Sequence, residues 1–200
     1  MSASSWVLPA PLYFVRHGET DWNAVARLQG QQDVPLNAVG RLQAEEAGRK
    51  VAELAAEPWG LDYVASPLGR TRETMEILRR TLGLDPAGYR TDERFVELTF
   101  GEWEGLTWRE VRGRAASLAA ERERDKWGFV PPGGESYAML LERLRSPARE
   151  LIRPTVLVSH GGVARALLVA LAGVPQHEAP RIDIWQGRVL VFENGAYYWR

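Results

Sequence analysis

Short apolar segments alternate with longer segments of helical periodicity along this chain of 200 residues. The clearest of them is Thr155–Ser159, which is nearly all apolar or β-branched, as expected of a strand buried on both faces of a sheet. Strands that are separated by helices favour a parallel sheet with helices on its faces. The other predicted strands are 12–15, 61–65, 89–91, 189–192 and 196–199.

Helix-start and helix-stop signals fill the intervals between these strands. Asn37 is a predicted N-cap of a helix that ends at Pro58, and Ser66 is a predicted N-cap of a helix that ends near Gly83. Thr107 begins a capping-box pattern for a helix that extends to about Lys126. Further helices are predicted over 135–150 and 162–171.

The last two predicted strands flank Glu193-Asn194-Gly195, a hairpin signal that adds an antiparallel edge to the sheet. We therefore expect an α/β fold, a three-layer α/β/α sandwich with a mostly parallel sheet and an antiparallel edge strand. The length and the absence of an interdomain linker favour a single domain over residues 1–200. Within it, residues 100–136 interrupt the alternation, and we expect them to form a lid or a side subdomain.

The composition is that of a globular protein, with 45% hydrophobic and 26% charged residues. The chain has no cysteine, which excludes disulfide scaffolds, thiolate metal sites and cysteine nucleophiles. It has only three histidines, so a histidine-rich metal site is not expected. The sequence therefore predicts neither a metal nor another cofactor.

Charge and hydropathy indicate neither a nucleic-acid partner nor a membrane partner. The formal net charge is −1, and no basic stripe is present. No apolar run approaches the ~20 residues of a membrane span. The segment Met1–Pro11 lacks the features of a secretory signal, so we expect a short tail before the first strand and a cytoplasmic protein.

Two histidines follow predicted strands. His17 comes after the first strand and His160 after the buried strand Thr155–Ser159, and a glycine directly follows each of them. Ligands of α/β sheets gather beyond the carboxyl ends of the strands, and glycine lets a ligand approach the backbone closely. The alternative is that each histidine only caps its strand and bonds to the backbone.

Arginines are predicted at the same edge of the sheet. Arg16 precedes the first histidine, and Arg70 lies in the first turn of the helix after the second strand. A cation at the N-terminus of a helix is destabilised by the helix dipole by about 0.3–1 kcal/mol, and a bound dianion would offset this cost. Guanidinium groups match phosphate oxygens in bidentate fashion, so these residues predict phosphoryl transfer without a metal.

Phosphoryl transfer to histidine also needs an acid that protonates the leaving oxygen. Glu97 is the best candidate in the sequence. From the residues alone its competitors are Glu93, Glu102 and Glu104.

These residues lie in motifs that resemble those of the histidine phosphatase superfamily, the phosphoglycerate-mutase-like proteins. The resemblance extends from about Leu12 to the C-terminal hairpin, and several motifs in the right order at fitting spacings are highly specific. The segments that carry it are Arg16-His17-Gly18-Glu19-Thr20 with Trp22-Asn23, Arg27-Leu28-Gln29-Gly30, Ser66-Pro67-Leu68-Gly69-Arg70-Thr71-Arg72-Glu73-Thr74, the Glu97 segment, Pro132-Gly133-Gly134-Glu135-Ser136 and Val158-Ser159-His160-Gly161-Gly162.

The resemblance implies roles for the site residues. His17 would be the nucleophile that becomes a phosphohistidine, and the neighbouring arginines should disfavour its protonation. Glu97 would protonate the leaving group and then act as the base that activates water. The partner implied is a small-molecule phosphomonoester. The residues expected to bind its phosphoryl group are Arg16, Arg70, His160, Asn23, Gln29, Gly30 and Gly161.

Within that superfamily the chain resembles the phosphatases, including the broad-specificity and α-ribazole phosphatase-like members. It lacks the basic arginine-arginine-serine-tyrosine element that phosphoglycerate mutases carry after the acid motif. We therefore expect hydrolysis of small phosphorylated metabolites. The alternatives are phosphoglycerate mutase-type transfer, a phosphohistidine protein phosphatase in signalling, and a catalytically silent binding module. A homodimer is one oligomeric state that the sequence allows.

Several aromatic side chains cluster in the segment that could form a lid. The favoured interpretation is a small hydrophobic core under a long loop. The alternative is an aromatic wall that selects apolar or planar leaving groups. The residues concerned are Phe100, Trp103, Trp108, Trp127 and Phe129.

Overall fold

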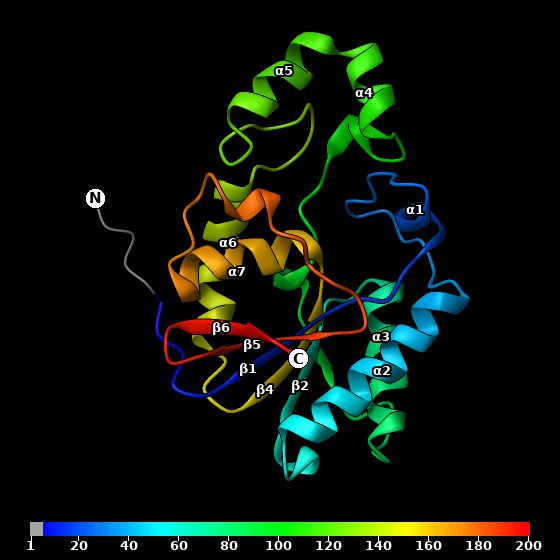
Figure 1. The fold of residues 1–200 in the computed structure, drawn as a ribbon, viewed down its shortest axis with the longest axis vertical. Helices are drawn as coiled ribbons and strands as arrows, with labels where there is room; N and C mark the ends of the chain where they lie inside the picture. Colours follow the sequence, from blue (N-terminus) through cyan, green and yellow to red (C-terminus); the bar gives the residue numbers. More distant parts are fainter. Residues whose placement is uncertain (1–5) are drawn as a thin grey trace.

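Six strands form the sheet at the centre of the computed structural model, which describes residues 6–200 (Figure 1). They are β1 (Leu12–Arg16), β2 (Asp62–Ala65), β3 (Arg90–Thr91), β4 (Thr155–Ser159), β5 (Val189–Glu193) and β6 (Ala196–Trp199). Their order is β3-β2-β4-β1-β5-β6. The first four in this order run parallel, whereas β5 pairs antiparallel with β1 and β6 pairs antiparallel with β5. The predicted mostly parallel sheet with an antiparallel edge is confirmed.

Helices cover both faces of this sheet. They are α1 (Asp21–Ala24), α2 (Ala38–Leu54), α3 (Gly69–Thr81), α4 (Trp108–Arg114), α5 (Ala116–Arg124), α6 (Tyr137–Arg149) and α7 (Gly161–Ala172). In Figure 1, α6 and α7 lie to one side of the sheet and α2 and α3 to the other. Single 3-10 turns occur at 58–60, 93–95, 101–103 and 179–181.

The central strand β4 shows why this sequence needs both helical layers. All five of its residues are buried. Leu157 packs in the cluster that contains α6 and α7, whereas Val156 and Val158 pack in the cluster that contains α2 and α3. Because side chains alternate along a strand, an apolar run of this kind is stable only between two apolar layers.

Two predicted helices differ from the observed ones. α3 begins at Gly69 rather than after Ser66, because the Ser66 hydroxyl is hydrogen-bonded to His160 instead of capping the helix. The predicted helix over 107–126 is two helices, interrupted at Ala115, whose φ and ψ are −141° and 59°. The predicted capping box at Thr107 is present.

α4 and α5 project beyond the carboxyl ends of the parallel strands, at the top of Figure 1. They enclose a small apolar cluster in which Trp103, Val111 and Ala119 are buried together with Leu28. Phe129 stacks on Trp103, with ring centroids 5.5 Å apart. The aromatic side chains of this segment therefore serve chiefly as a core. Trp127 belongs to the main core, where it stacks on Tyr137.

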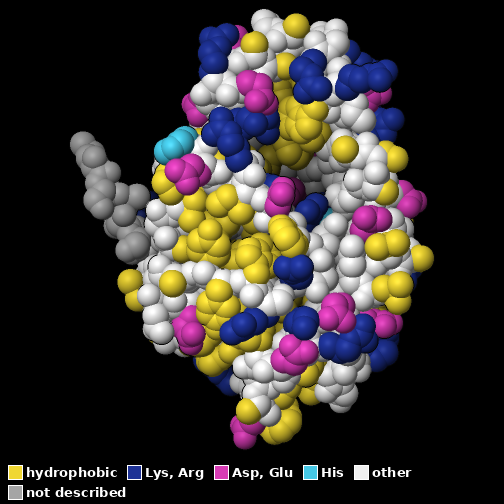
Figure 2. Space-filling view, viewed as in Figure 1, with side chains coloured by type: hydrophobic (Ala, Val, Ile, Leu, Met, Phe, Trp, Pro, Cys, Tyr) yellow, Lys and Arg dark blue, Asp and Glu magenta, His cyan; other side chains and the backbone are white. Residues whose placement is uncertain are grey.

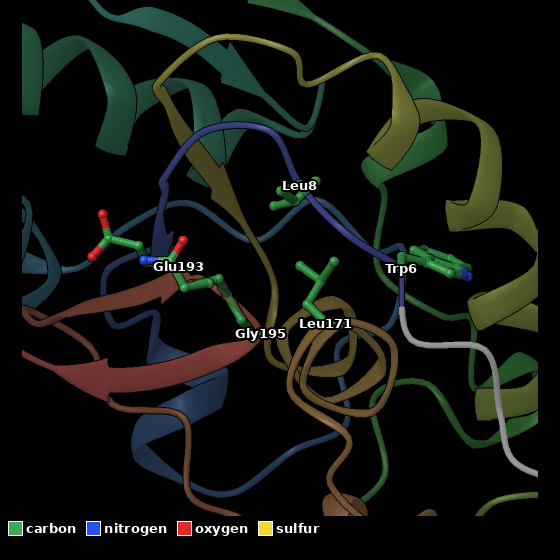
Figure 3. Close-up of a pocket in the computed structure, with 7 residues that line it drawn as sticks. Trp6, Leu8, Leu171, Glu193 and Gly195 are labelled. Carbon is green, nitrogen blue, oxygen red and sulfur yellow. The ribbon is translucent and has the colours of Figure 1, made fainter.

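The chain before β1 packs against α7 and the final hairpin. The backbone N–H of Trp6 donates to the carbonyl of Ala170 at 2.8 Å. Figure 3 shows Leu8 and Leu171 beside a small recess that the hairpin residues Glu193 and Gly195 also line. Of the predicted tail Met1–Pro11, residues 1–5 lie outside the described residues. Among residues 6–200, no helix is both long enough and apolar enough to cross a membrane.

Candidate active site

One cavity of about 140 Å³ gathers eight of the nine residues that the sequence singled out. It lies at the carboxyl edge of the parallel strands, and Figure 2 shows the surface hollowed between the α4–α5 end and the rest of the molecule. A larger surface recess beside Val39 and Arg188 contains none of those residues. The predicted residues that line the cavity are Arg16, His17, Asn23, Gln29, Gly30, Arg70, Glu97 and Gly161.

His17 leaves β1 with its imidazole in a fixed tautomer. Its backbone N–H bonds to the carbonyl of Ser159 at 2.9 Å, which continues the β1–β4 pairing. The ring Nδ1 lies 2.8 Å from the carbonyl of Gly18, and Arg70 Nε donates to Nε2 at 3.3 Å. Because a guanidinium only donates, Nε2 carries the lone pair and Nδ1 carries the proton.

The imidazole of His17 is neutral for a physical reason. Burial lowers its pKa well below the ordinary value, and the positive charges of Arg70 and Arg16 lower it further. The hydrogen bond to Gly18 opposes this shift. The predicted effect of the neighbouring arginines on His17 is confirmed.

His160 is the N-cap residue of α7 and is completely buried beside this ring. The two imidazole centroids are 5.3 Å apart. Nδ1 of His160 lies 3.3 Å from Arg70 Nη2 and therefore accepts, while Nε2 donates to the Ser66 hydroxyl at 2.8 Å. Burial and the charge of Arg70 hold the pKa of His160 well below its ordinary value. His160 is thus behind Arg70 and does not itself line the cavity.

Arg70 joins both histidines to the loop after α1. Its side chain is completely buried, and it donates to the carbonyls of Gln32 at 2.6 Å and Gly30 at 2.8 Å. Burial lowers the pKa of Arg70. The interpretation that each histidine only bonds to the backbone therefore fails, since one guanidinium contacts both rings.

Two polar atoms at the cavity have no partner. Arg16 Nε and Gln29 Oε1 are the only buried side-chain nitrogen or oxygen atoms of residues 6–200 without a hydrogen bond. An unmade bond of this kind costs roughly 1–3 kcal/mol, so its presence indicates a site built for a polar ligand. The rest of Arg16 is fixed by a 2.8 Å bond to the carbonyl of Ile184, and burial lowers the pKa of Arg16 to about 10.

Asn23 is oriented by the polypeptide around it. Its Oδ1 accepts from the backbone N–H of Thr20 and from Gln186 Nε2, each at 3.2 Å. The amide nitrogen thus remains to donate toward the cavity, which Asn23 lines. Gln186 also donates to the carbonyl of His17 at 3.0 Å, so one side chain fixes both residues.

Glu97 is held at the start of α7. Its two carboxylate oxygens accept from the backbone N–H groups of Leu98 and Gly162, each at 3.0 Å. A Cβ on Gly162 would lie 2.2 Å from Glu97 Oε1, so any side chain there would displace the carboxylate. Of the four carboxylates that competed in the sequence, Glu97 alone lines the cavity, since Glu93, Glu102 and Glu104 are absent from its walls.

Sequence reasoning missed Arg165, and it named Arg27 and Leu28 only as parts of a motif and Phe100 only as part of the aromatic cluster. Arg27, Leu28, Phe100 and Arg165 also line the cavity. Helical spacing could have identified Arg165, because it lies four residues after Gly161 and therefore on the same face of the helix. Among residues 6–200, no group of three or more histidine, cysteine or acidic side chains is placed to hold a metal ion.

The arrangement of these residues agrees with a comparison against known families. The family model of the histidine phosphatase superfamily (branch 1) matches residues 12–200. The chain belongs to the histidine phosphatase superfamily. The resemblance seen in its motifs is thereby confirmed.

Some relatives of this histidine phosphatase are named as phosphatases, and others are named as mutases. A glucosyl-3-phosphoglycerate phosphatase of Mycolicibacterium vanbaalenii is 37% identical over 186 residues, which cover 87% of this chain and 76% of the relative. A protein of Escherichia fergusonii named "Probable phosphoglycerate mutase GpmB" is 36% identical over 185 residues, covering 86% and 80%. A solved mycobacterial glucosyl-3-phosphoglycerate phosphatase in complex with VO3 superposes with a TM-score of 0.79 at 32% identity, over 96% of each chain. The chain is a phosphoric monoester hydrolase of this superfamily, as its sequence predicted.

Proposed function

We propose that this histidine phosphatase hydrolyses small phosphorylated metabolites without a metal, through a phosphohistidine on His17. The observation that carries the proposal is the contact of one guanidinium, that of Arg70, with both imidazoles beside unpaired buried polar atoms. The name of the mycobacterial relatives supports small phosphorylated sugars as the substrate class.

In the first step, the lone pair of His17 Nε2 attacks phosphorus, and the bond from phosphorus to the leaving oxygen breaks. The protonated carboxyl of Glu97 gives its proton to that oxygen, so the product leaves as an alcohol. The new N–P bond puts positive charge on the ring, which the Nδ1–H bond to the Gly18 carbonyl stabilises. We assign Arg16, Arg70, Asn23, Gln29, Gly30 and Gly161 to the binding of the phosphoryl group, whereas His160, which lies behind Arg70, positions that guanidinium.

In the second step, the carboxylate of Glu97 takes a proton from water. The hydroxyl oxygen attacks phosphorus, the N–P bond breaks, and inorganic phosphate forms. His17 returns to the neutral tautomer with its proton on Nδ1, and Glu97 is protonated again. Each group therefore ends the cycle in its starting state.

An assay with p-nitrophenyl phosphate and a set of sugar phosphates tests the proposal. We expect phosphate release by the wild-type protein, also after treatment with a chelator, and a loss to background in His17→Ala. Hydrolysis that does not exceed the His17→Ala background would support the silent binding module. Activity that needs an added metal ion would refute the metal-independent mechanism.

The relative named as a mutase favours one second candidate, phosphoryl transfer between hydroxyl groups. Incubation with 3-phosphoglycerate separates the two activities. We expect more inorganic phosphate than 2-phosphoglycerate, and the reverse result would favour the mutase. A cytoplasmic location, a homodimer and the absence of nucleic-acid binding stay predictions from the sequence.

A further inference from the structure

The chain between the 3-10 turn that follows α7 and strand β5 holds one wall of the active-site cavity (Figure 1). The carbonyl of Ile182 accepts from Arg165 Nε at 3.0 Å, and the carbonyl of Ile184 accepts from Arg16 Nη1 at 2.8 Å. Both arginines line the cavity. Further along, the backbone of Gln186 forms a parallel bridge with that of Arg16. One short segment therefore fixes two guanidinium groups of the cavity.

Gln186 contacts the cavity wall through its side chain. Its Nε2 donates to the carbonyl of His17 at 3.0 Å and to Oδ1 of Asn23 at 3.2 Å. An amide nitrogen has two hydrogens, so these two bonds use all its donors and fix the orientation of the Gln186 amide. One nitrogen atom thereby links the backbone of the proposed nucleophile to a side chain that lines the cavity.

The two partners of Gln186 differ in how firmly the rest of the structure holds them. The backbone of His17 is fixed already, because its N–H bonds to the carbonyl of Ser159 at 2.9 Å and continues the β1–β4 pairing. Oδ1 of Asn23 accepts from the backbone N–H and the hydroxyl of Thr20, each at 3.2 Å. Bonds of this length are at the long end of the usual range and hold an amide weakly. Gln186 therefore supplies the link from the Asn23 amide to a fixed point of the sheet.

We propose that Gln186 is a positioning residue for phosphoryl binding, because it holds the Asn23 amide with its nitrogen directed at the phosphoryl group that His17 receives. The inference rests on the proposed phosphatase function, and it adds to that site a residue outside every motif that the sequence analysis singled out. Ile182 and Ile184 act through backbone carbonyls, which no side-chain substitution removes. Gln186 acts through its side chain, so its role can be tested directly.

Inorganic phosphate is the probe, measured as a competitive inhibitor of p-nitrophenyl phosphate hydrolysis and by titration calorimetry. Gln186→Met keeps the length of the side chain without its donors. We expect it to weaken phosphate binding by about 3- to 10-fold, the range of one neutral hydrogen bond, and to change kcat less because the sheet still holds His17. In an Asn23→Ala background the same substitution should weaken binding by less than about twofold, since the amide that Gln186 orients is gone.

Gln186→Glu gives a readout that a packing role does not predict. A carboxylate nearly matches the shape of the glutamine amide, but an ionised carboxylate only accepts hydrogen bonds. Beside Oδ1 of Asn23 it would attract the Asn23 nitrogen instead, so the amide would rotate and turn its oxygen toward the phosphate. We expect Gln186→Glu to weaken phosphate binding at least about threefold more than Gln186→Met, and this excess to shrink in the Asn23→Ala background.

Gln176→Met is the matched control, because Gln176 is an exposed glutamine, and it should leave the affinity for phosphate unchanged. If Gln186→Met does not fold, the isosteric Gln186→Glu carries the same comparison. Unchanged phosphate affinity in the Gln186 variants would overturn the proposal. Effects of the Gln186 and Asn23 substitutions that multiply independently would also overturn it, because they assign Gln186 to packing or charge alone. A wild-type protein that binds phosphate without hydrolysing p-nitrophenyl phosphate would instead contradict the proposed function, and the calorimetric comparison would still decide the role of Gln186.

Discussion

At the scale of single residues, burial and Arg70 together keep both histidines of the site unprotonated. Because an arginine only donates, it makes Nε2 of His17 and Nδ1 of His160 acceptors, and both rings must be neutral. A neutral imidazole with a free lone pair is what attack on phosphorus requires. Two buried neutral histidines also make the stability of the fold depend on pH.

The free energy of unfolding should fall as the pH falls below about 6.5, the ordinary pKa of histidine. The folded-state pKa values of His17 and His160 are well below that value, so the unfolded chain binds more protons in this range. Stability therefore rises with pH through it, with a slope of at most about 2.7 kcal/mol per pH unit for two protons. Urea unfolding at several pH values between about 5 and 8 measures this slope.

Variants of the two buried histidines test whether these residues cause the dependence of the free energy of unfolding on pH. His160→Gln and His17→Gln should each reduce it by about half, because each removes one of two titrating groups. His177→Gln is the control, since that side chain is 77% exposed. A slope that is the same in all three variants and the wild type would contradict the assignment.

Replacement of Gly162 by alanine should disable Glu97. The added Cβ would lie 2.2 Å from Glu97 Oε1 and 2.8 Å from Leu98 Cδ2, so the carboxylate must move. General acid–base catalysis contributes about 10²- to 10⁴-fold, and we expect kcat to fall by about 10²-fold or more. Gly113→Ala is the control, because no heavy atom lies within 4 Å of its added Cβ. An unchanged kcat in Gly162→Ala would show that Glu97 is not the acid.

The sequence motifs identified most residues of the site. The hydrogen bonds that hold those residues in place could not be predicted from the sequence. Ser66 resembled a helix cap, and only the tertiary structure shows its hydroxyl bonded to His160. Gln186 lies 169 residues from the histidine whose carbonyl it holds. Single side chains that act across such separations leave no local pattern in a sequence.

At the scale of elements, Glu104 connects the two loops that form the cavity. Its Oε1 accepts from the Thr99 hydroxyl at 2.7 Å and from the backbone N–H of Gln31 at 3.1 Å. Its Oε2 accepts from Gln32 Nε2 at 3.0 Å. The first loop carries Glu97, and the second supplies the carbonyls that hold Arg70. Glu104 is thus a positioning residue for both.

We expect Glu104→Gln to lower kcat by up to about 10²-fold, the effect of a misplacement near 1 Å, with a smaller change of KM. Glu102→Gln is a matched control from the same turn, because Glu102 is exposed. The steady-state kinetics of both variants with p-nitrophenyl phosphate provide the measurement. A loss of activity equal in the two variants would refute the positioning role.

Element boundaries show where sequence patterns stop being sufficient. β4 was predictable in full because burial on both faces requires an apolar run. The interruption at Ala115 was not, since alanine itself is a strong helix former and the chain breaks there where α4 and α5 both contribute to the cluster around Trp103. Tertiary contacts here override local propensity.

At the scale of the whole molecule, the α4–α5 end and the sheet differ in their buried cores. The cluster around α4 and α5 has four buried side chains, whereas α7 packs in a much larger cluster that spans the sheet. Regions with little buried apolar surface open locally at lower free energy than the main core. We expect backbone amides of α4 and α5 to exchange with deuterium at least about tenfold faster than those of α7. Equal protection of these helices by mass spectrometry would contradict this expectation.

The most direct test of the central claim is detection of the phosphoryl group on His17. Glu97→Gln should form the intermediate from p-nitrophenyl phosphate, whose leaving group needs little protonation, but should hydrolyse it slowly because the base is missing. After a quench in alkali, which preserves phosphohistidine, peptide mass spectrometry should find one phosphoryl group on His17. A phosphoryl group on another residue, or none on His17 while the wild-type enzyme turns over, would contradict the mechanism.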